Sequence, residues 1–180
     1  IMKTRGISVT GTKFGIAFTA KFLNQGNALV NVHRDGTVQV STGATEMGQG
    51  VNTKIQQVVA HAFGIPIDKI RVMATSTEKN HNTSPTAASS GSDINAAAED
   101  KAAQKICQRL IWIAEQIRIG TVMNDVFACP EINLNKINFS DYRLQHQVIQ
   151  HSPTGWKIDW NEVITKAYFN RISLGEYAHF

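Results

Sequence analysis

Two stretches of small residues could bind a ligand through the peptide backbone. The first is GATEMGQG (43–50) and the second is NTSPTAASSGSD (82–93); each joins a segment of strand character to one of helix character. Backbone N–H groups at a helix start lack partners within the helix and lie at the positive end of its dipole, which suits a phosphate or another anion. Small side chains also let a ligand approach the backbone closely. One such loop is more typical of an ordinary turn, but two in one chain indicate a bulky, polar, anionic ligand.

The motifs of common nucleotide and metal sites are incomplete in this sequence. Gly43 and Gly48 have the glycine spacing of a P-loop, but Gln49 and Gly50 stand where that motif needs Lys and Ser or Thr. The same loop lacks the G-x-G-x-x-G pattern of dinucleotide-binding domains. The six histidines show no HExxH or other metal spacing, and no Ser, His and acid stand out as a hydrolase triad. The residue patterns alone therefore indicate anion binding and no further chemistry.

A hairpin and a helix are predicted to position the first stretch. Asp35-Gly36 lies between two alternating runs, 27–33 and 37–42, and predicts a β-hairpin with a primed turn, because Asp and Gly tolerate positive φ. Apolar residues at helical spacing predict a helix over 51–63 that ends at Gly64. A run rich in Phe, Ile and Thr predicts another strand over 14–24.

The second stretch is predicted to lie between a strand over 70–75 and a long helix over about 95–117, with Ser92 or Asp93 as its N-cap. Patterns are weaker after Gly120: a strand over 142–150, a Ser-Pro-Thr-Gly turn over 152–155 and a short amphipathic helix over 160–172. These elements predict an α/β (α+β) fold with mixed β-sheets, helices packed on one face and the two loops converging.

Composition narrows the class of protein. Hydrophobic residues make up 42% and charged residues 18% of the 180 residues, which is ordinary for a folded globular chain, and a net charge of +4 without a basic stripe gives no indication of nucleic-acid binding. No apolar run is long enough for a bilayer, and no signal peptide is expected. Cys107 and Cys129 form no disulfide framework, so we expect free thiols and a cytoplasmic protein. Because the first residue is Ile1, we expect a piece cut from a longer chain.

Three segments resemble the molybdopterin-binding part of xanthine dehydrogenases, in the xanthine oxidase family of molybdenum hydroxylases. They are FGIAFTAKFLNQGNALVNVHRDGTVQV, GATEMGQGVNTKIQQVVA and TSTEKNHNTSPTAASSGSD. The resemblance is close from Lys13 to Ala98 and weaker from Trp156 to Tyr177. It implies that residues 1–180 are a fragment of a molybdopterin-binding domain, with 13–120 as the best-supported part and 121–180 as a weaker hairpin and helix region. F-T-x-x-F-L-N-Q favours the xanthine dehydrogenase branch.

The resemblance implies hydroxylation of a heterocycle carbon with water as the oxygen source, here of hypoxanthine and xanthine to urate. Electrons would leave through 2Fe-2S clusters and FAD, on other domains or subunits, to NAD. In the family, a pterin dithiolene holds the molybdenum, which explains the missing Cys and His ligands. The partners implied are a purine, the remainder of the molybdenum subunit and the Fe-S/FAD part, with no nucleic acid and no membrane.

The resemblance also assigns roles to residues of both loops. Gln49 would hydrogen-bond an oxo ligand of the molybdenum without adding charge, with the backbone of Gly48 against the cofactor. Phe18 would stack edge-to-face on the purine, and Thr19 would hydrogen-bond it; by its strand context alone, Phe18 would be a core aromatic. The residues expected along the pterin and its phosphate are Thr86, Ala88, Ser89 and Ser92.

The sequence departs from the family in ways that limit its chemistry. The family's general-base glutamate lies in a G-E-P-P-like segment, which is absent, so no catalytic residue is assigned and neither Glu46 nor Glu176 takes that role. Asn52 and Gly91 replace residues found in relatives, and Gly91 could remove one phosphate contact. We therefore expect the 180-residue chain alone to be inactive, to hold no molybdenum and to dimerise or aggregate modestly. The alternatives are a fragment of an aldehyde or other N-heterocycle hydroxylase, or a non-catalytic binding domain of the same fold.

Overall fold

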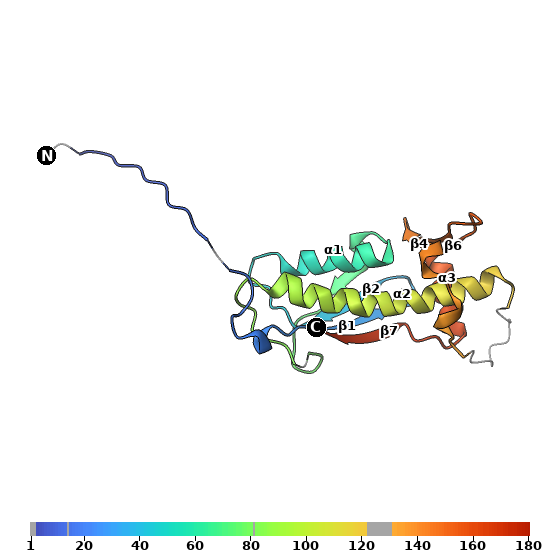
Figure 1. Ribbon diagram of the computed structural model, residues 1–180. Coiled ribbons are helices and arrows are strands. Elements are labelled where there is room, and N and C mark those ends of the chain that lie inside the picture. Colours follow the sequence, from blue (N-terminus) through green and yellow to red (C-terminus); the bar gives the residue numbers. More distant parts are fainter. Residues whose placement is uncertain (1–2, 14, 81, 122–130) are drawn as a thin grey trace.

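The described part of the chain forms a four-stranded mixed sheet, a three-stranded meander and three α-helices (Figure 1). The computed structural model describes residues 3–13, 15–80, 82–121 and 131–180. The larger sheet has the order β3-β2-β1-β7, in which β1 is antiparallel to both of its neighbours while β2 and β3 are parallel. Its strands are β1 (Asn27–Val32), β2 (Val38–Thr42), β3 (Ile70–Val72) and β7 (Gly175–His179).

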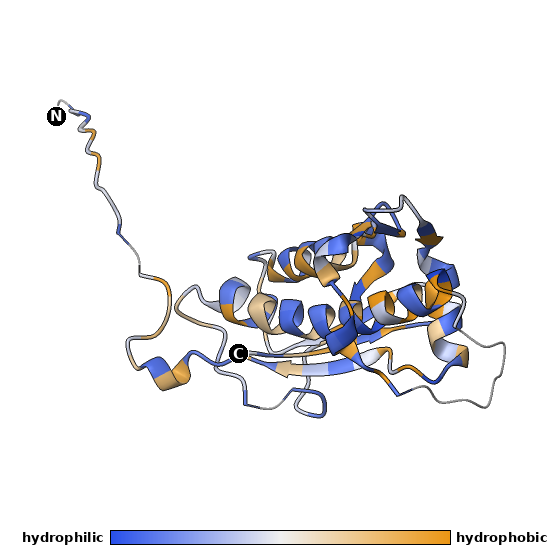
Figure 2. Ribbon diagram, turned by 45° about the vertical axis from the view of Figure 1, so that its right-hand side comes forward, coloured by the Kyte–Doolittle hydropathy of each residue, from blue (hydrophilic) through white to orange (hydrophobic). Residues whose placement is uncertain are grey.

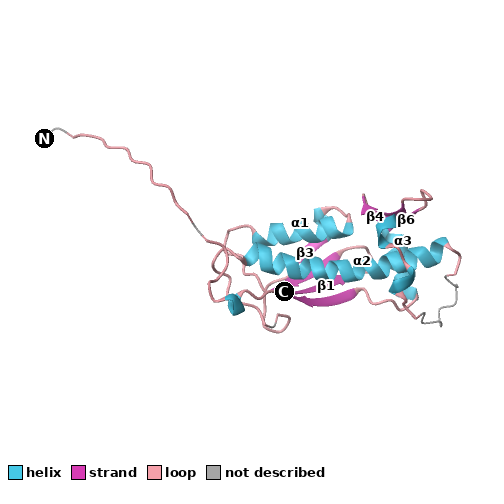
Figure 3. Cartoon of the chain, viewed as in Figure 1, coloured by secondary structure: helices cyan, strands magenta, loops and turns pink. Residues whose placement is uncertain are grey.

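Two long helices, α1 (Val51–Phe63) and α2 (Ala96–Arg118), cover the same face of this sheet (Figure 3). The helix α1 packs on β3, α2 packs on β1 and β7, and the helices pack on each other. Alternate strand residues such as Val30 and Val40 are fully buried beneath them. Both helices alternate hydrophilic and hydrophobic stretches, as amphipathic helices do (Figure 2). The predicted fold class and the helix over 51–63 are confirmed.

The predicted hairpin forms between β1 and β2, but its turn differs from the expected primed type. Among residues 33–37 only Gly36 has positive φ (82°). The N–H of Gly36 donates to the carbonyl of His33 at 2.9 Å, and the N–H of His33 donates to the carbonyl of Thr37 at 2.8 Å. The loop is therefore longer than a two-residue primed turn and has a single left-handed residue, Gly36. The Asp35 carboxylate accepts hydrogen bonds from the N–H and the hydroxyl of Thr37.

The region after residue 130 forms a β-meander and a helix. Where one strand was predicted over 142–150, the structure has two antiparallel strands joined at His146 and Gln147, which both have positive φ (53° and 61°) as in a tight primed turn. The turn over 152–155 is present and leads to a third strand. The elements are β4 (Tyr142–Gln145), β5 (Val148–His151), β6 (Lys157–Asp159) and α3 (Trp160–Phe169).

Trp160 connects this C-terminal part to the main sheet. Its side chain is 1% exposed, and its indole N–H donates to the carbonyl of Gly36 at 2.9 Å. Its ring lies against Phe63 of α1 with 5.4 Å between centroids. A buried indole needs a partner for its single donor, so this bond fixes where α3 begins relative to the β1–β2 hairpin.

Three expectations about local structure are wrong. Residues 15–24 form no strand, and the segment pairs with neither edge strand of the larger sheet, β3 or β7. The strand expected over 70–75 ends at Val72. Neither Ser92 nor Asp93 caps α2 with its side chain, because a single π-helical turn (Gly91–Asn95) leads into the helix instead. The short 3-10 helices are Lys21–Leu23, Ile67–Lys69, Leu134–Lys136 and Phe139–Asp141.

Residues 3–13 extend away from the body of the molecule (Figure 1), with Ile7 97% and Val9 95% exposed. No helix in the described ranges has the length and apolar character needed to cross a bilayer. Cys107 is a free thiol in the core, where burial raises its pKa to about 12, while Cys129 lies outside the described residues.

Gly64 allows a stability test of the contact between α1 and the meander. It ends α1 at φ +64°, and a Cβ there would lie 2.3 Å from the carbonyl oxygen of Leu144. Gly64→Ala should therefore lower the free energy of unfolding by more than the roughly 1–2 kcal/mol of a left-handed alanine alone. Gly120→Ala is the matched control, with φ +75° and open space around the site. Equal losses for both variants in urea unfolding would contradict the contact.

Candidate functional site

The first loop (residues 43–50) and the second loop (residues 82–93) meet beyond the ends of β2 and β3. The N–H of Thr45 donates to Oγ1 of Thr86 at 2.8 Å, which joins the loops directly. Near this junction, the hydroxyl of Thr75 donates to the carbonyl of Ala44 at 2.8 Å. A Cβ on Gly43 would lie 2.1 Å from Oγ1 of Thr83, so this position has room only for glycine. The predicted convergence of the two loops is confirmed.

Glu46 organises the first loop. Its carboxylate accepts the N–H groups of Gly48 (2.8 Å), Gly50 (2.9 Å) and Asn52 (3.0 Å) at the start of α1. These bonds, that from Asn52 most of all, hold the pKa of Glu46 below its ordinary value. The expectation of unpaired N–H groups in this loop is therefore wrong for these three groups, because a side chain of the loop itself already binds them.

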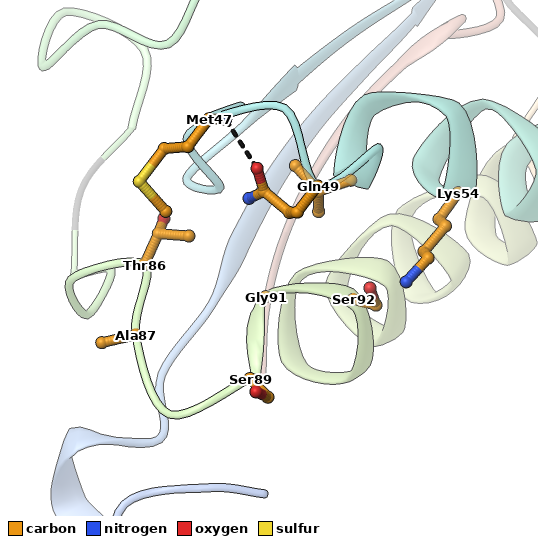
Figure 4. Close-up of a pocket in the computed structure, with 9 residues that line it drawn as sticks. Met47, Gln49, Lys54, Thr86, Ala87, Ser89, Gly91 and Ser92 are labelled. Carbon is orange, nitrogen blue, oxygen red and sulfur yellow. Dashed lines mark hydrogen bonds between the residues drawn. The ribbon is translucent and has the colours of Figure 1, made fainter. Parts of the chain in front are cut away.

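The Gln49 side chain is exposed and bound to its own loop. Its Oε1 accepts the N–H of Met47 at 2.6 Å (Figure 4), and its Nε2 donates to the carbonyl of Thr45 at 2.8 Å. A primary amide has two N–H bonds, so Nε2 keeps a second donor for another acceptor. These bonds hold the amide in one orientation without using up its capacity to donate.

The second loop is held in a conformation that side-chain-bearing residues seldom adopt. Ala88 and Ser89 both have positive φ (52° and 55°), which costs on the order of 1–3 kcal/mol per residue and is commonly found at functional sites. The carbonyl of Ala88 accepts the N–H of Ala17 at 3.0 Å. Phe18 and Thr19 directly follow Ala17 in the sequence, so this hydrogen bond places their backbone close to the second loop. Phe18 is half-buried, and Thr19 is exposed.

One cavity of about 350 Å³ lies between the two loops (Figure 4). Of the predicted site residues, Gln49, Thr86, Ser89 and Ser92 line it, whereas Gly48, Ala88, Phe18 and Thr19 do not. The first N–H groups of a helical turn have no acceptor within it. Here those groups begin at Gly91 and end before Ile94, whose N–H donates to the carbonyl of Ser90 at 3.1 Å. The lining residues are Met47, Gln49, Val51, Lys54, Thr86, Ala87, Ser89, Gly91 and Ser92.

Lys54 is a lining residue that the sequence reasoning missed. Among the described residues it is the one charged residue in the lining, and it extends from the first turn of α1 towards Ser92 (Figure 4). A cation in the first turn lies at the positive end of the helix dipole, where acidic residues are normally favoured. This unfavourable position is the feature of the sequence that could have identified Lys54, because an anion bound between the loops would compensate the repulsion between Lys54 and the helix dipole.

Glu176 is held by cations away from the loops. Its carboxylate lies 2.7 Å from Nη1 of Arg109 and 3.1 Å from Nζ of Lys105. Burial alone would raise the pKa of Glu176, but the hydrogen bonds from these cations hold it below its ordinary value. With Glu46 bound to backbone N–H groups, neither carboxylate has the raised pKa or the free position of a general base. Within the described ranges, no three His, Cys, Asp or Glu side chains gather as metal ligands.

Comparison with curated proteins gives xanthine dehydrogenases. The chain is 49% identical over 127 residues to xanthine dehydrogenase 1 of Arabidopsis thaliana, covering 71% of this chain and 9% of that protein. It is 41% identical over 172 residues to the xanthine dehydrogenase of Drosophila pseudoobscura pseudoobscura, covering 96% and 10%. The chain thus spans about a tenth of the length of these relatives.

Solved structures share the fold at low sequence identity. Quinoline 2-oxidoreductase from Pseudomonas putida 86 superposes with a TM-score of 0.70 at 22% identity, over 87% of this chain and 19% of that one. A Cu,Mo-CO dehydrogenase superposes with a TM-score of 0.60 at 20% identity, over 86% and 18%. A family model described as "Molybdopterin cofactor-binding domain" matches residues 2–180. Because that match runs over almost the whole sequence, the chain belongs to the family of molybdopterin cofactor-binding domains.

Proposed function

We propose that this chain forms one wall of the molybdenum-cofactor and substrate site of a xanthine dehydrogenase. The observation that carries the proposal is the cavity between the two loops, which combines small side chains, helix-start N–H groups and the charge of Lys54. These groups suit a bulky anion better than a neutral ligand. The identity of 40–53% to proteins named xanthine dehydrogenases or xanthine dehydrogenase/oxidase supports the branch.

The residues present fit a molybdenum–pterin cofactor with a phosphate group. Lys54, with the N–H groups at Gly91 and Ser92, would bind the phosphate, and hydroxyls of the second loop would add hydrogen bonds. The bound cofactor would supply the redox chemistry of hydroxylation with water as the oxygen source. Gln49 would donate its second amide N–H to the cofactor, and the backbone of Gly48 and Ala88 would shape the loops around it. The hydroxyls meant are those of Thr86, Ser89 and Ser92.

Phe18 and Thr19 are proposed to contact the purine, hypoxanthine or xanthine. Support comes from the Ala17–Ala88 hydrogen bond, which holds this segment beside the second loop. The side chain of Asn24 also binds both backbone groups of Phe18: it accepts the Phe18 N–H at 2.9 Å and donates to the Phe18 carbonyl at 3.0 Å. Because Phe18 is outside the cavity lining, the purine would lie between this segment and the rest of the parent protein. Aldehyde or other N-heterocycle hydroxylation is the second candidate, and a non-catalytic binding domain is the third.

We further propose that residues 1–180 are a piece of one cofactor-binding domain and are inactive alone. The 2Fe-2S clusters, FAD and the site of NAD reduction would lie on other domains or subunits. A cytoplasmic location stays a prediction from the cysteine content. The prediction that the isolated chain dimerises or aggregates and holds no molybdenum also stays untested, although its exposed Ile7 and Val9 agree with surfaces made for contact.

Gln49→Ala in the full parent complex is the first test of the proposal. The variant should lose at least about tenfold in xanthine-dependent urate formation, the effect of one lost hydrogen bond of roughly 1.4 kcal/mol in the transition state. Urate is measured together with molybdenum on the same sample, and Gln57→Ala on the exposed side of α1 is the control. A wild-type complex that contains stoichiometric molybdenum but forms no urate would indicate that the substrate is an aldehyde or another heterocycle. Absence of both in a matured complex would favour the non-catalytic domain.

Lys54→Gln tests the anion-binding role of the cavity. Removing this charge should weaken cofactor retention, seen as several-fold faster molybdenum loss during dialysis, and higher salt should narrow the difference from the wild type. Lys136→Gln changes an exposed lysine in a separate 3-10 helix and should retain molybdenum as the wild type does. Equal molybdenum loss for the two variants at low salt would refute the role of Lys54.

A further inference from the structure

Glu99 is a buried carboxyl without a charged partner. It lies in the first turn of α2 and is 0% exposed, and among the described residues the one polar group that acts on its carboxyl is the Thr42 hydroxyl, whose geometry falls short of a full hydrogen bond. An ionised carboxylate in such a place is very unfavourable, so the group takes up a proton instead. Burial raises the pKa of Glu99 to about 8, although the Thr42 hydroxyl acts in the opposite direction. Glu99 is therefore mainly the neutral acid at pH 7.

Glu99 is connected to the first loop through Thr42, and it lies one helical turn after Asn95, which binds the second loop. Thr42, the last residue of β2, provides the polar group that acts on Glu99, and its Oγ1 also accepts the N–H of Ala44 at 3.2 Å at the start of the first loop. One helical turn before Glu99, buried Asn95 donates to the carbonyl of Gly91, a lining residue of the cavity, at 3.3 Å. The Oδ1 of Asn95 lacks a partner, as the Glu99 oxygens do. Residues four apart share a helix face, so a carboxylic acid proton is available to an acceptor there.

The charged groups on neighbouring elements do not compensate Glu99. Strands β1 and β2 contain no titratable residue. On β7, Glu176 is held by Arg109, and the exposed His179 lies at the carbonyl of Asn82. Lys54 and His61 on α1 and Asp93 in the π-helical turn are also exposed. On α2 itself, the following residue Asp100 is only half-buried and does not contribute to the shift. Ionisation of Glu99 would thus place an unpaired charge in the first turn of α2, beside Thr42, which leads into the first loop.

We propose that Glu99, as the neutral acid, is a positioning residue that holds the two loops together around the cavity, and that its ionisation at alkaline pH releases them. The proposal rests on the proposed cofactor site for its consequence, which is loss of cofactor at high pH. An ionised Glu99 must draw in water or move outwards. Either change displaces Thr42 with the start of the first loop and α2 with Gly91.

The direction of the pH effect follows from the raised pKa. The folded chain holds the Glu99 proton that the unfolded chain gives up near the ordinary pKa of 4.5. The contribution of neutral Glu99 is therefore fully present below pH 4.5 and is lost as the pH rises through about 8. Both loop order and cofactor retention should fall across that window and not towards acid.

Two measurements on the full parent complex test this inference. The first is the molybdenum retained after incubation between pH 6 and pH 10 and gel filtration. The second is hydrogen exchange at the Thr45 N–H, which donates to Thr86 across the loops. Wild type should lose molybdenum, and lose protection at Thr45, about tenfold more per pH unit from pH 6 up to about pH 8 and level off above it, after correction for the intrinsic exchange rate. Glu99→Gln, a neutral side chain of the same shape, should remove both pH dependences, and Glu78→Gln on an exposed loop should change neither.

The outcomes separate this inference from the proposed function. Wild type without molybdenum at every pH would refute the cofactor site, while exchange at Thr45 would still decide the role of Glu99. Identical pH profiles for wild type and Glu99→Gln would overturn the inference. If Glu99→Gln does not fold, the Thr42→Val variant is measured in its place. It removes the hydroxyl between Glu99 and Ala44 and should make exchange at Thr45 independent of pH, and an unchanged alkaline loss would again overturn the inference.

Discussion

The parallel pairing of β2 with β3 is the constraint on which the site depends. Parallel neighbours cannot be joined by a tight turn and need a crossover, which α1 provides. The carboxyl ends of both strands then lie at one edge of the sheet, so the segments that leave them start side by side. Ligand sites of open α/β sheets form at such edges. The cavity between the two loops is the local result of this strand order.

Backbone and side-chain polar groups fix the conformation of the two loops where they meet. Glu46 closes the first loop on itself, and the positive φ values at Ala88 and Ser89 bend the second. Gly43 leaves the room that Thr83 occupies. Beneath them, Glu99 is the polar group that packing alone does not explain, because an apolar residue would fill the same volume without a cost in desolvation. A buried polar group at this place agrees with a role in loop position rather than in stability.

The sequence predicted those elements whose signal is local. The helix over 51–63 was predicted to the residue, because its apolar spacing and Gly64 depend only on the chain itself. The β1–β2 hairpin was correct for the same reason, apart from its turn. The strand over 14–24 was wrong, because a strand needs a neighbour to pair with, and the described part of this segment pairs with no strand of the sheet. Four of the expected site residues line the cavity, but Lys54 was missed, since its direction is set by the packing of α1.

The sequence by itself determined the segments, the loop composition and the resemblance to a molybdenum hydroxylase, because residue type and spacing are properties of the chain. The tertiary structure alone decided which backbone N–H groups were already bound, which cation extends towards the cavity, and that Glu99 is buried without a charged partner. These features arise from contacts between residues far apart in sequence, where desolvation and hydrogen-bond partners depend on what packs around each group.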